Sequence, residues 1–195
     1  MEAIDLGLSV KWANCNMSAT LLEEYGNYYA WGEIIPKNIY KWDTYKWCNE
    51  RSITLTKYNT SSNDGSVDNK TVLELADDAA AANWGGAWRM PTDEEWTELR
   101  TNCTWTGTTN YNGTGVAGQI VTSITNGNHI FLPAAGYRSF GDLYFAGGYS
   151  GYWSSSLYTD GPSRALDVDI RSDGVYRNDY LRFCGQSVRP VTIPK

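Results

Sequence analysis

The sequence predicts a single α+β domain in which two helices pack on small antiparallel sheets with much irregular loop. Three observations carry this prediction. The 195 residues include 19 glycines and 14% aromatic residues, which indicates a turn-rich chain packed by aromatic side chains. Helix signals occur twice in the first half of the chain. Short alternating stretches separated by turn residues dominate the second half, as is typical of antiparallel strands.

The first part of the chain predicts one strand followed by loops. Residues 6–16 alternate apolar with small or polar residues, which favours an early strand. Residues 25–48 are rich in Tyr and Trp but are interrupted by glycines and by Pro36, so we expect irregular loop and short strand held by aromatic burial. Residues 59–69 predict a solvated loop. They lack the alternating acids and the closing Glu of a calcium loop, and no metal is expected there.

Two helices are expected next. The first covers roughly Val72–Ala82 and ends before the turn signal in residues 83–86. The second lies in Met90–Arg100. Thr92, with Glu95 three residues later, forms the pattern of a capping box, in which each side chain satisfies a backbone N–H at the start of the helix. This second helix is the better marked of the two.

Beyond residue 105 the chain predicts strands and turns. The best strand candidates are Gln119–Thr122, His129–Leu132, Gly151–Ser154 and Leu166–Ile170. Strict alternation in the last of these directs Leu166, Val168 and Ile170 towards a core. Asp167, Asp169 and Arg171 then face the other side of the sheet and project outward.

Asp173-Gly174 follows this strand and is a strong hairpin signal. A two-residue turn there predicts the pairs Arg171 with Tyr176, Asp169 with Asn178 and Asp167 with Tyr180. The same register sets Arg177 and Asp179 opposite Ile170 and Val168, on a face that should be buried. We therefore expect the pairing to end, bulge or bend soon after Tyr176.

Charge and hydropathy exclude several partner classes. The formal net charge is −6, and no cluster of Lys and Arg is present, which argues against nucleic acid or an anionic membrane as a partner. No run of about twenty apolar residues predicts a membrane span. Met1 leads directly into an acidic segment without the pattern of a signal peptide, which suits either a trimmed chain or a cytosolic protein.

No catalytic or metal-binding pattern is visible. The four cysteines, Cys15, Cys48, Cys103 and Cys184, contain no CxxC pair, so we expect no zinc site but buried free thiols or one bridge between Cys15 and Cys48. The single histidine, His129, starts a strand without a recognisable nucleophile nearby. The acids mostly stand beside Gly, Ser and Asn, as exposed acids do, so a glycosidase pair is not supported. We expect no enzyme activity and no cofactor.

Residues 151–188 have the composition of a contact surface. They contain neither Lys nor Glu and are rich in Tyr, Asp, Arg, Asn and Ser. Tyr offers large contact area at low entropic cost, and the short polar residues offer adaptable hydrogen bonds, as in antibody paratopes. An ordinary solvated face is the alternative, but such a face would favour Lys and Glu.

Six blocks of sequence carry a family resemblance. They are Asp5–Ala13 (DLGLSVKWA), Glu24–Glu33 (EYGNYYAWGE), Trp84–Thr92 (WGGAWRMPT), Ile130–Arg138 (IFLPAAGYR), Gly151–Ser156 (GYWSSS) and Ser187–Val191 (SVRPV). Together they resemble a large group of Bacteroides-type surface proteins with the C-type-lectin-like fold of the formylglycine-generating-enzyme superfamily. This group includes the variable target proteins of diversity-generating retroelements, which display a diversified C-terminal region on a fixed scaffold.

The resemblance implies one C-type-lectin-like domain over residues 1–195, with scaffold in 1–138, a variable ligand-binding region in 139–184 and a closing scaffold strand in 185–195. The implied contact residues are Phe140, Asp142, Tyr144, Phe145, Tyr158, Asp160, Arg164, Asp167, Asp169, Arg171, Asp173, Tyr176, Asn178, Tyr180 and Phe183. The ligand would be a protein or a glycan on another cell or host surface. The domain would be a monomer displayed on a bacterial surface or a phage particle.

Two departures limit what the resemblance implies. The enzymes of the superfamily use paired cysteines near the C-terminus, where this chain has only Cys184, so oxidase activity is not expected. The sugar-binding motifs of calcium-dependent lectins are absent as well, so calcium-mediated sugar binding is not expected. Two alternatives stay open: a structural or adhesin subunit of a surface or pilus assembly without diversification and, as a weaker hypothesis, an oxidase of the formylglycine-generating type.

Overall fold

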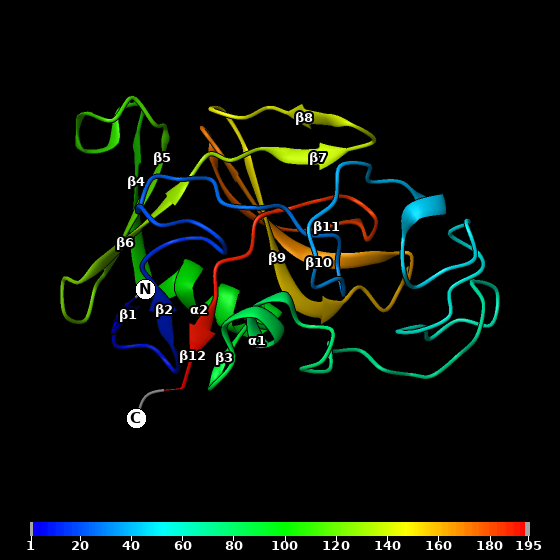
Figure 1. Cartoon of the computed structure of the whole chain (residues 1–195). Helices are drawn as coiled ribbons and strands as arrows, with labels where there is room; N and C mark the ends of the chain where they lie inside the picture. Colours follow the sequence, from blue (N-terminus) through cyan, green and yellow to red (C-terminus); the bar gives the residue numbers. More distant parts are fainter. Residues whose placement is uncertain (1, 194–195) are drawn as a thin grey trace.

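A computed structural model describes residues 2–193 and shows a mixed fold dominated by strands in small antiparallel sheets. Figure 1 shows the arrangement: the sheet β4-β5-β6 lies at one side, the sheet β9-β10-β11 lies in the middle, and long loops fill the opposite side. The hairpin β7–β8 lies along the top of the middle sheet in this view. The predicted α+β class is thereby confirmed at the level of mixed helices and small antiparallel sheets.

The two ends of the chain meet in one sheet of short strands. Its order is β1-β2-β12-β3, formed by Ala3–Ile4, Lys11–Ala13, Val191–Thr192 and Trp88–Arg89. The early strand expected over residues 6–16 is therefore much shorter than predicted, because only β2 pairs with neighbours. Residues 7–10 form bends, and Leu6 directly before them is buried.

The remaining strands confirm the four strand candidates and extend them. In chain order they are β4 (Cys103–Thr108), β5 (Gly118–Ser123), β6 (His129–Pro133), β7 (Tyr137–Ser139), β8 (Asp142–Tyr144), β9 (Ser150–Leu157), β10 (Arg164–Arg171) and β11 (Gly174–Leu181). β9 is buried along its whole length, so the GYWSSS block is a core strand, as expected of scaffold.

The two helices differ in how well the sequence places them. α2 spans Asp93–Asn102 and begins with the predicted capping box: the Thr92 side chain accepts from the Glu95 N–H, and Glu95 accepts from the Thr92 N–H at 2.8 Å. α1 spans only Ala79–Trp84. Residues 72–78 are not helical, because the Asp78 carboxylate caps the helix by accepting from the N–H groups of Ala80 and Ala81.

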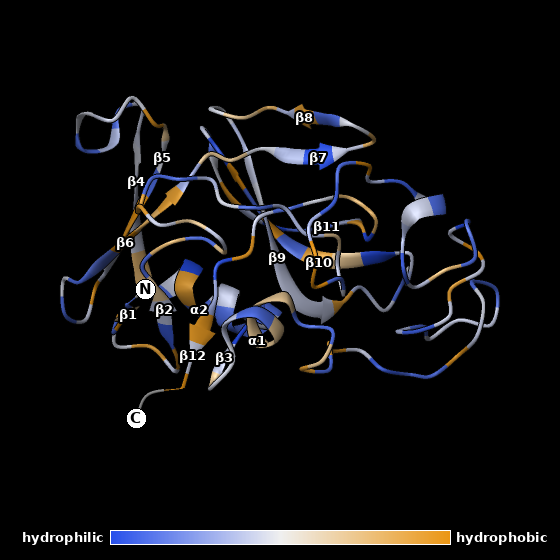
Figure 2. Ribbon diagram, in the orientation of Figure 1, coloured by the Kyte–Doolittle hydropathy of each residue, from blue (hydrophilic) through white to orange (hydrophobic). Residues whose placement is uncertain are grey.

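Aromatic side chains fill the core, as the composition predicts. Trp12 and Trp96 pack with ring centroids 4.7 Å apart, and Tyr152 of β9 contacts Trp96 from the other side. Trp153 is fully buried, and its indole N–H donates to the Tyr29 carbonyl at 2.8 Å. Figure 2 shows apolar segments of α2 and β12 lying close together. This packing fixes β9 and β10 against the helix.

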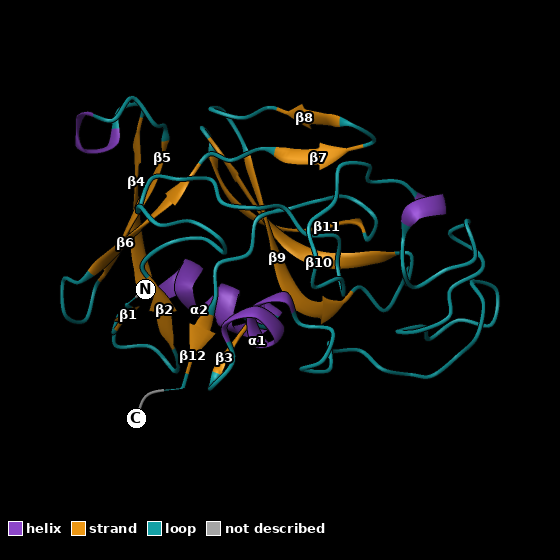
Figure 3. Ribbon diagram, in the orientation of Figure 1, coloured by secondary structure: helices purple, strands orange, loops and turns teal. Residues whose placement is uncertain are grey.

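Long loops follow β2, as predicted for residues 25–48, and Figure 3 shows them in teal around the middle sheet. Apart from the 3-10 helix η1 (Trp42–Thr44), residues 25–48 form only isolated bridges. Arg182 anchors these loops through neutral acceptors. Its buried guanidinium donates to the Tyr45 hydroxyl at 2.9 Å and to the carbonyls of Lys57, Tyr58 and Pro162 at 2.8–3.0 Å.

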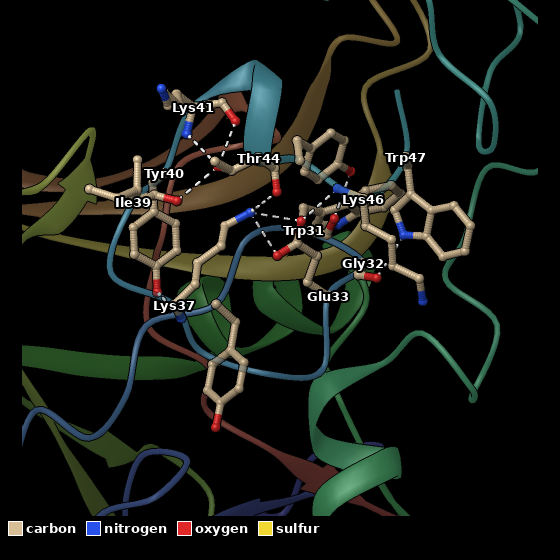
Figure 4. A network of polar contacts seen from close by, with 12 residues as sticks. Trp31, Gly32, Glu33, Lys37, Ile39, Tyr40, Lys41, Thr44, Lys46 and Trp47 are labelled. Atoms are coloured by element: carbon tan, nitrogen blue, oxygen red, sulfur yellow. Dashed lines mark hydrogen bonds and ion pairs between the residues drawn. The ribbon is translucent and has the colours of Figure 1, made fainter. Parts of the chain in front are cut away.

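A second polar network shapes the same loops. Figure 4 shows Lys37 at its centre: the ammonium donates to Glu33 and to the Thr44 carbonyl, both at 2.8 Å. Glu33 also accepts the Lys46 N–H at 2.8 Å, and the Trp47 indole donates to the Gly32 carbonyl. All the donors of Lys37 are used within the protein, so this cation supports the loop.

The loop of residues 59–69 is irregular, as predicted, but its first residue, Asn59, is fully buried. Asp68 organises it by accepting from the N–H groups of Tyr58, Asn59 and Lys70. Within residues 2–193 no group of three or more His, Cys, Asp or Glu side chains could hold a metal ion. The four cysteines are free, so the bridge considered between Cys15 and Cys48 does not form.

Candidate ligand-binding groove

The β10–β11 hairpin builds one wall of the candidate site, in a register that differs from the predicted one. Arg171 pairs with Gly174, Asp169 with Tyr176 and Asp167 with Asn178, so the turn is Ser172-Asp173 and the predicted pairs are wrong by two residues. A shift of two preserves the face on which each side chain lies. The same polar face therefore forms, with different neighbours.

The pairing continues to Leu181, and the expected end, bulge or bend after Tyr176 is wrong for this strand pair. β11 is the edge strand of its sheet, so its charged side chains reach partners at the rim instead of entering the core. The Arg177 guanidinium donates to the Asp93 carboxylate at the start of α2 at 2.8 Å, and Asp179 pairs with Arg164.

Asp167 and Asp169 do not project into solvent, contrary to the prediction. Their side chains lie on the predicted face, but only 1% and 2% of the two residues are exposed, because other chain segments cover this face. The Asp169 carboxylate accepts a hydrogen bond from the Tyr149 hydroxyl and one from the Arg171 guanidinium, the latter at 2.6 Å. Burial and this carboxylate raise the pKa of Tyr149, which therefore remains a hydrogen-bond donor.

Asp167 lies deeper still. One carboxylate oxygen accepts from the Gln186 amide at 2.8 Å, and the other has no hydrogen-bond partner within residues 2–193. Burial and the neighbouring Asp169 carboxylate raise the pKa of Asp167 well above its usual value. Asp167 is thus part of the floor beneath the face, and a ligand cannot touch it.

A groove of about 850 Å³ lies between this hairpin and the segment that runs from β7 to β9. Of the fifteen predicted contact residues, seven line it: Phe145, Arg164, Asp169, Arg171, Asp173, Asn178 and Tyr180. The remaining lining residues are Tyr137, Ala146, Gly148, Tyr149 and Ser172. The volume lies within the range of about 300–1,000 Å³ that is typical of small-ligand sites.

Four neighbouring aromatic residues line the groove, and we call Tyr137, Phe145, Tyr149 and Tyr180 the aromatic wall. Tyr137 is its hub, with ring centroids 5.0 Å from Tyr180 and 5.9 Å from Tyr149. Phe145 is 67% exposed and has a φ of +57°, a conformation that costs a bulky residue about 1–3 kcal/mol. The fold thus holds an apolar ring in solvent at the groove's edge.

Sequence reasoning missed Tyr137 and Tyr149. Tyr137 belongs to a block that was assigned to the scaffold, and Tyr149 stands two residues before Gly151, the first residue of GYWSSS. The available signal was the enrichment of tyrosine at the ends of the two framing blocks, because a tyrosine at the end of a buried strand can carry its ring to the surface.

The other predicted residues lie outside the groove. Phe140 and Asp142 are exposed at the turn of the β7–β8 hairpin, and Tyr144 stacks on Tyr137. Tyr158 and Asp160 belong to the turn between β9 and β10, at the opposite end of the sheet from the β10–β11 turn.

Two more of the predicted residues differ in their exposure. Tyr176 is 43% exposed, with the Arg171 guanidinium 5.5 Å from its ring centroid. Phe183 is buried against Trp42, so its prediction as a contact residue is wrong.

The residues considered for catalysis are not part of the groove. Burial raises the pKa of the Cys184 thiol to about 12, so the reactive thiolate is disfavoured at neutral pH. His129 is exposed at the start of β6 and does not line the groove.

Comparison with known proteins adds no assignment. Scans against protein-family models, curated proteins and solved structures found no significant match. Among the described residues, none of the helices has the length and apolar character needed to span a bilayer. The candidate site therefore rests on its own geometry.

Proposed function

We propose that this chain is a non-enzymatic binding domain of C-type-lectin-like fold, whose ligand is held in the groove between the β10–β11 hairpin and the β7–β9 segment. We further propose that it is displayed on a bacterial surface or a phage particle as a variable protein of the retroelement type. The observation that carries the proposal is that the aromatic wall and the side chains of Arg164, Arg171 and Asn178 line one groove.

The physical argument is one of composition and preorganisation. Aromatic rings supply contact area, and a few fixed polar groups supply orientation, which is the usual construction of a ligand site. The polar groups here are held before any ligand arrives, since Asp169 fixes Arg171 and Asp179 fixes Arg164. Preorganisation lowers the entropic cost of binding.

Two phenylalanines provide a matched test. Phe145 and Phe140 are both exposed and both have positive φ, at +57° and +52°, but only Phe145 lines the groove. Asn tolerates this conformation, so Phe145→Asn removes the ring without new backbone strain. Phe140→Asn is the matched control, because it makes the same substitution at an exposed phenylalanine that does not line the groove.

We expect the wild-type domain to bind at least one member of arrays carrying defined glycans and bacterial surface proteins. Phe145→Asn should weaken that binding about tenfold or more, the equivalent of 1.4 kcal/mol, and Phe140→Asn should not. Equal binding by the wild-type protein and Phe145→Asn would refute the groove as the site. A stable oligomer that buries the groove, seen by light scattering, would instead favour a structural subunit.

A further inference from the structure

A second hollow extends the groove. It measures about 490 Å³ and lies between the sheet β4-β5-β6 and the turn of the β10–β11 hairpin. It shares Gly148, Arg171 and Ser172 with the groove, so the two spaces meet at this turn. We call the second hollow the side arm. Groove and side arm together form an elongated site, longer than a single small ring needs.

Both arginines of the groove are already paired with carboxylates. Arg171 is paired with Asp169, and Arg164 is paired with Asp179, which leaves Asp173 as the one further charged side chain of the lining. An anionic ligand would have to compete with one of these intramolecular pairs for its guanidinium. A neutral ligand can instead use the guanidinium and amide N–H groups that remain, without displacing either pair.

The side chains that line the side arm also favour a neutral ligand. Besides Arg171, its polar side chains are neutral and come from Thr108, Thr109, Gln119 and Ser172. Gly107 lies next to Gln119, and a Cβ at residue 107 would approach the Gln119 amide nitrogen to 3.4 Å. The absence of that side chain leaves the face of the Gln119 amide open.

The backbone of β5, the middle strand of its sheet, is not free to pair with a ligand in the side arm. Gly118 and Gln119 belong to β5, which is paired with β4 on one side and with β6 on the other. Strand addition by an extended peptide requires an unpaired strand edge, so it cannot occur on β5. On β5 recognition therefore relies on side chains such as the Gln119 amide, which suits a ligand rich in hydroxyl groups.

From these observations we propose that the groove and the side arm together bind a neutral oligosaccharide of two or more rings. One sugar ring lies with its C–H face on the aromatic wall, and its hydroxyls meet Asn178 and Arg171. The next ring passes the turn at Ser172 and reaches the Thr and Gln side chains of the side arm. This inference rests on the proposed function, because it assigns a ligand class to the same site.

The test uses titration calorimetry and saturation-transfer NMR with defined probes. The neutral probes are cellotetraose, maltotetraose, mannotetraose and N-acetylchitotetraose with their disaccharides. Tetragalacturonic acid and acidic and basic hexapeptides are the charged probes. We expect at least one neutral tetrasaccharide to bind. Phe145→Asn should weaken both the tetrasaccharide and its disaccharide by about tenfold or more, whereas Gln119→Ala should weaken the tetrasaccharide severalfold and leave the disaccharide unchanged.

The outcomes separate this inference from the proposed function. Preferential binding of a charged sugar or a peptide, or no binding of any neutral tetrasaccharide, overturns the ligand class. If the bound ligand is then a peptide or protein that Phe145→Asn releases, the proposed function still holds. Equal effects of Gln119→Ala on the tetrasaccharide and the disaccharide overturn the role of the side arm. If Phe145→Asn weakens the binding of no saccharide, peptide or protein that the wild-type domain binds, both proposals are refuted.

Discussion

Replacing Asp167 with Asn should make this protein more stable at neutral pH. The side chain is 1% exposed, and one of its two oxygens has no partner within residues 2–193, while the other accepts from Gln186. The neighbouring Asp169 carboxylate adds like-charge repulsion and, together with burial, raises the pKa of Asp167. Asparagine keeps the shape of the side chain and removes the charge.

The magnitude follows from the charge on a buried carboxylate that is only partly hydrogen-bonded, and from the proton balance. Such a group costs about 1–3 kcal/mol or more when it is charged, so removing the charge should raise Tm by about 2–12 °C in a chain of this size. Below the usual pKa of 3.8, the folded and unfolded forms are both protonated at Asp167, so the group has no effect on stability. As the pH rises past this value, only the unfolded chain releases the proton, and the wild-type protein loses stability until the pH reaches the raised folded-state pKa.

The assay is thermal unfolding of both proteins between pH 3.5 and pH 8. Asp167→Asn should be the more stable protein at pH 7, and the difference should shrink towards zero near pH 3.5. Other carboxylates, such as Asp77 with its lowered pKa, contribute equally to both proteins and cancel in the difference. A variant that is less stable than the wild type at pH 7, or a difference that stays constant with pH, would refute the reasoning.

Three further substitutions test other parts of the fold by urea unfolding. Arg182→Met should cost more than about 3 kcal/mol, because it removes four hydrogen bonds to buried acceptors, and a loss below 1 kcal/mol would contradict the anchoring role. Gly151→Ala should cost about 1–3 kcal/mol, because the new Cβ would lie 2.7 Å from the Gln186 amide oxygen; unchanged stability would show that Gln186 can move away. Thr92→Ala should cost about 1 kcal/mol by removing the α2 cap, and Thr92→Ser should retain most of it.

Local signals in the sequence predicted local structure well. The capping box at Thr92 and the strand over Leu166–Ile170 were predicted from residues a few positions apart, and both are confirmed. The helix expected over Val72–Ala82 is wrong in its first half, because the alanine-rich pattern was extended backwards past Asp78. Asp is a preferred N-cap residue, so the start of α1 was itself readable from the sequence.

Register and burial were harder to predict, because they depend on distant segments. The turn at Ser172-Asp173 changes each strand pair by two residues without changing the pattern of faces, so alternation alone could not detect the error. Alternation also says which side of a sheet a residue occupies but not what covers that side. Tyr149 and Gln186 come from outside the hairpin, and together they bury Asp167 and Asp169.

The proposed binding face therefore consists of two layers with different physical roles. Phe145 and Asp173 lie in the outer layer, where a substitution changes what a ligand meets and costs little stability. Asp167 and Asp169 lie in the inner layer, where each carboxylate is bonded to a scaffold or rim side chain. Because Asp169 sets the position of Arg171, a substitution of Asp169 should alter ligand binding by moving the Arg171 guanidinium. A binding face of this construction can vary freely only in its outer layer.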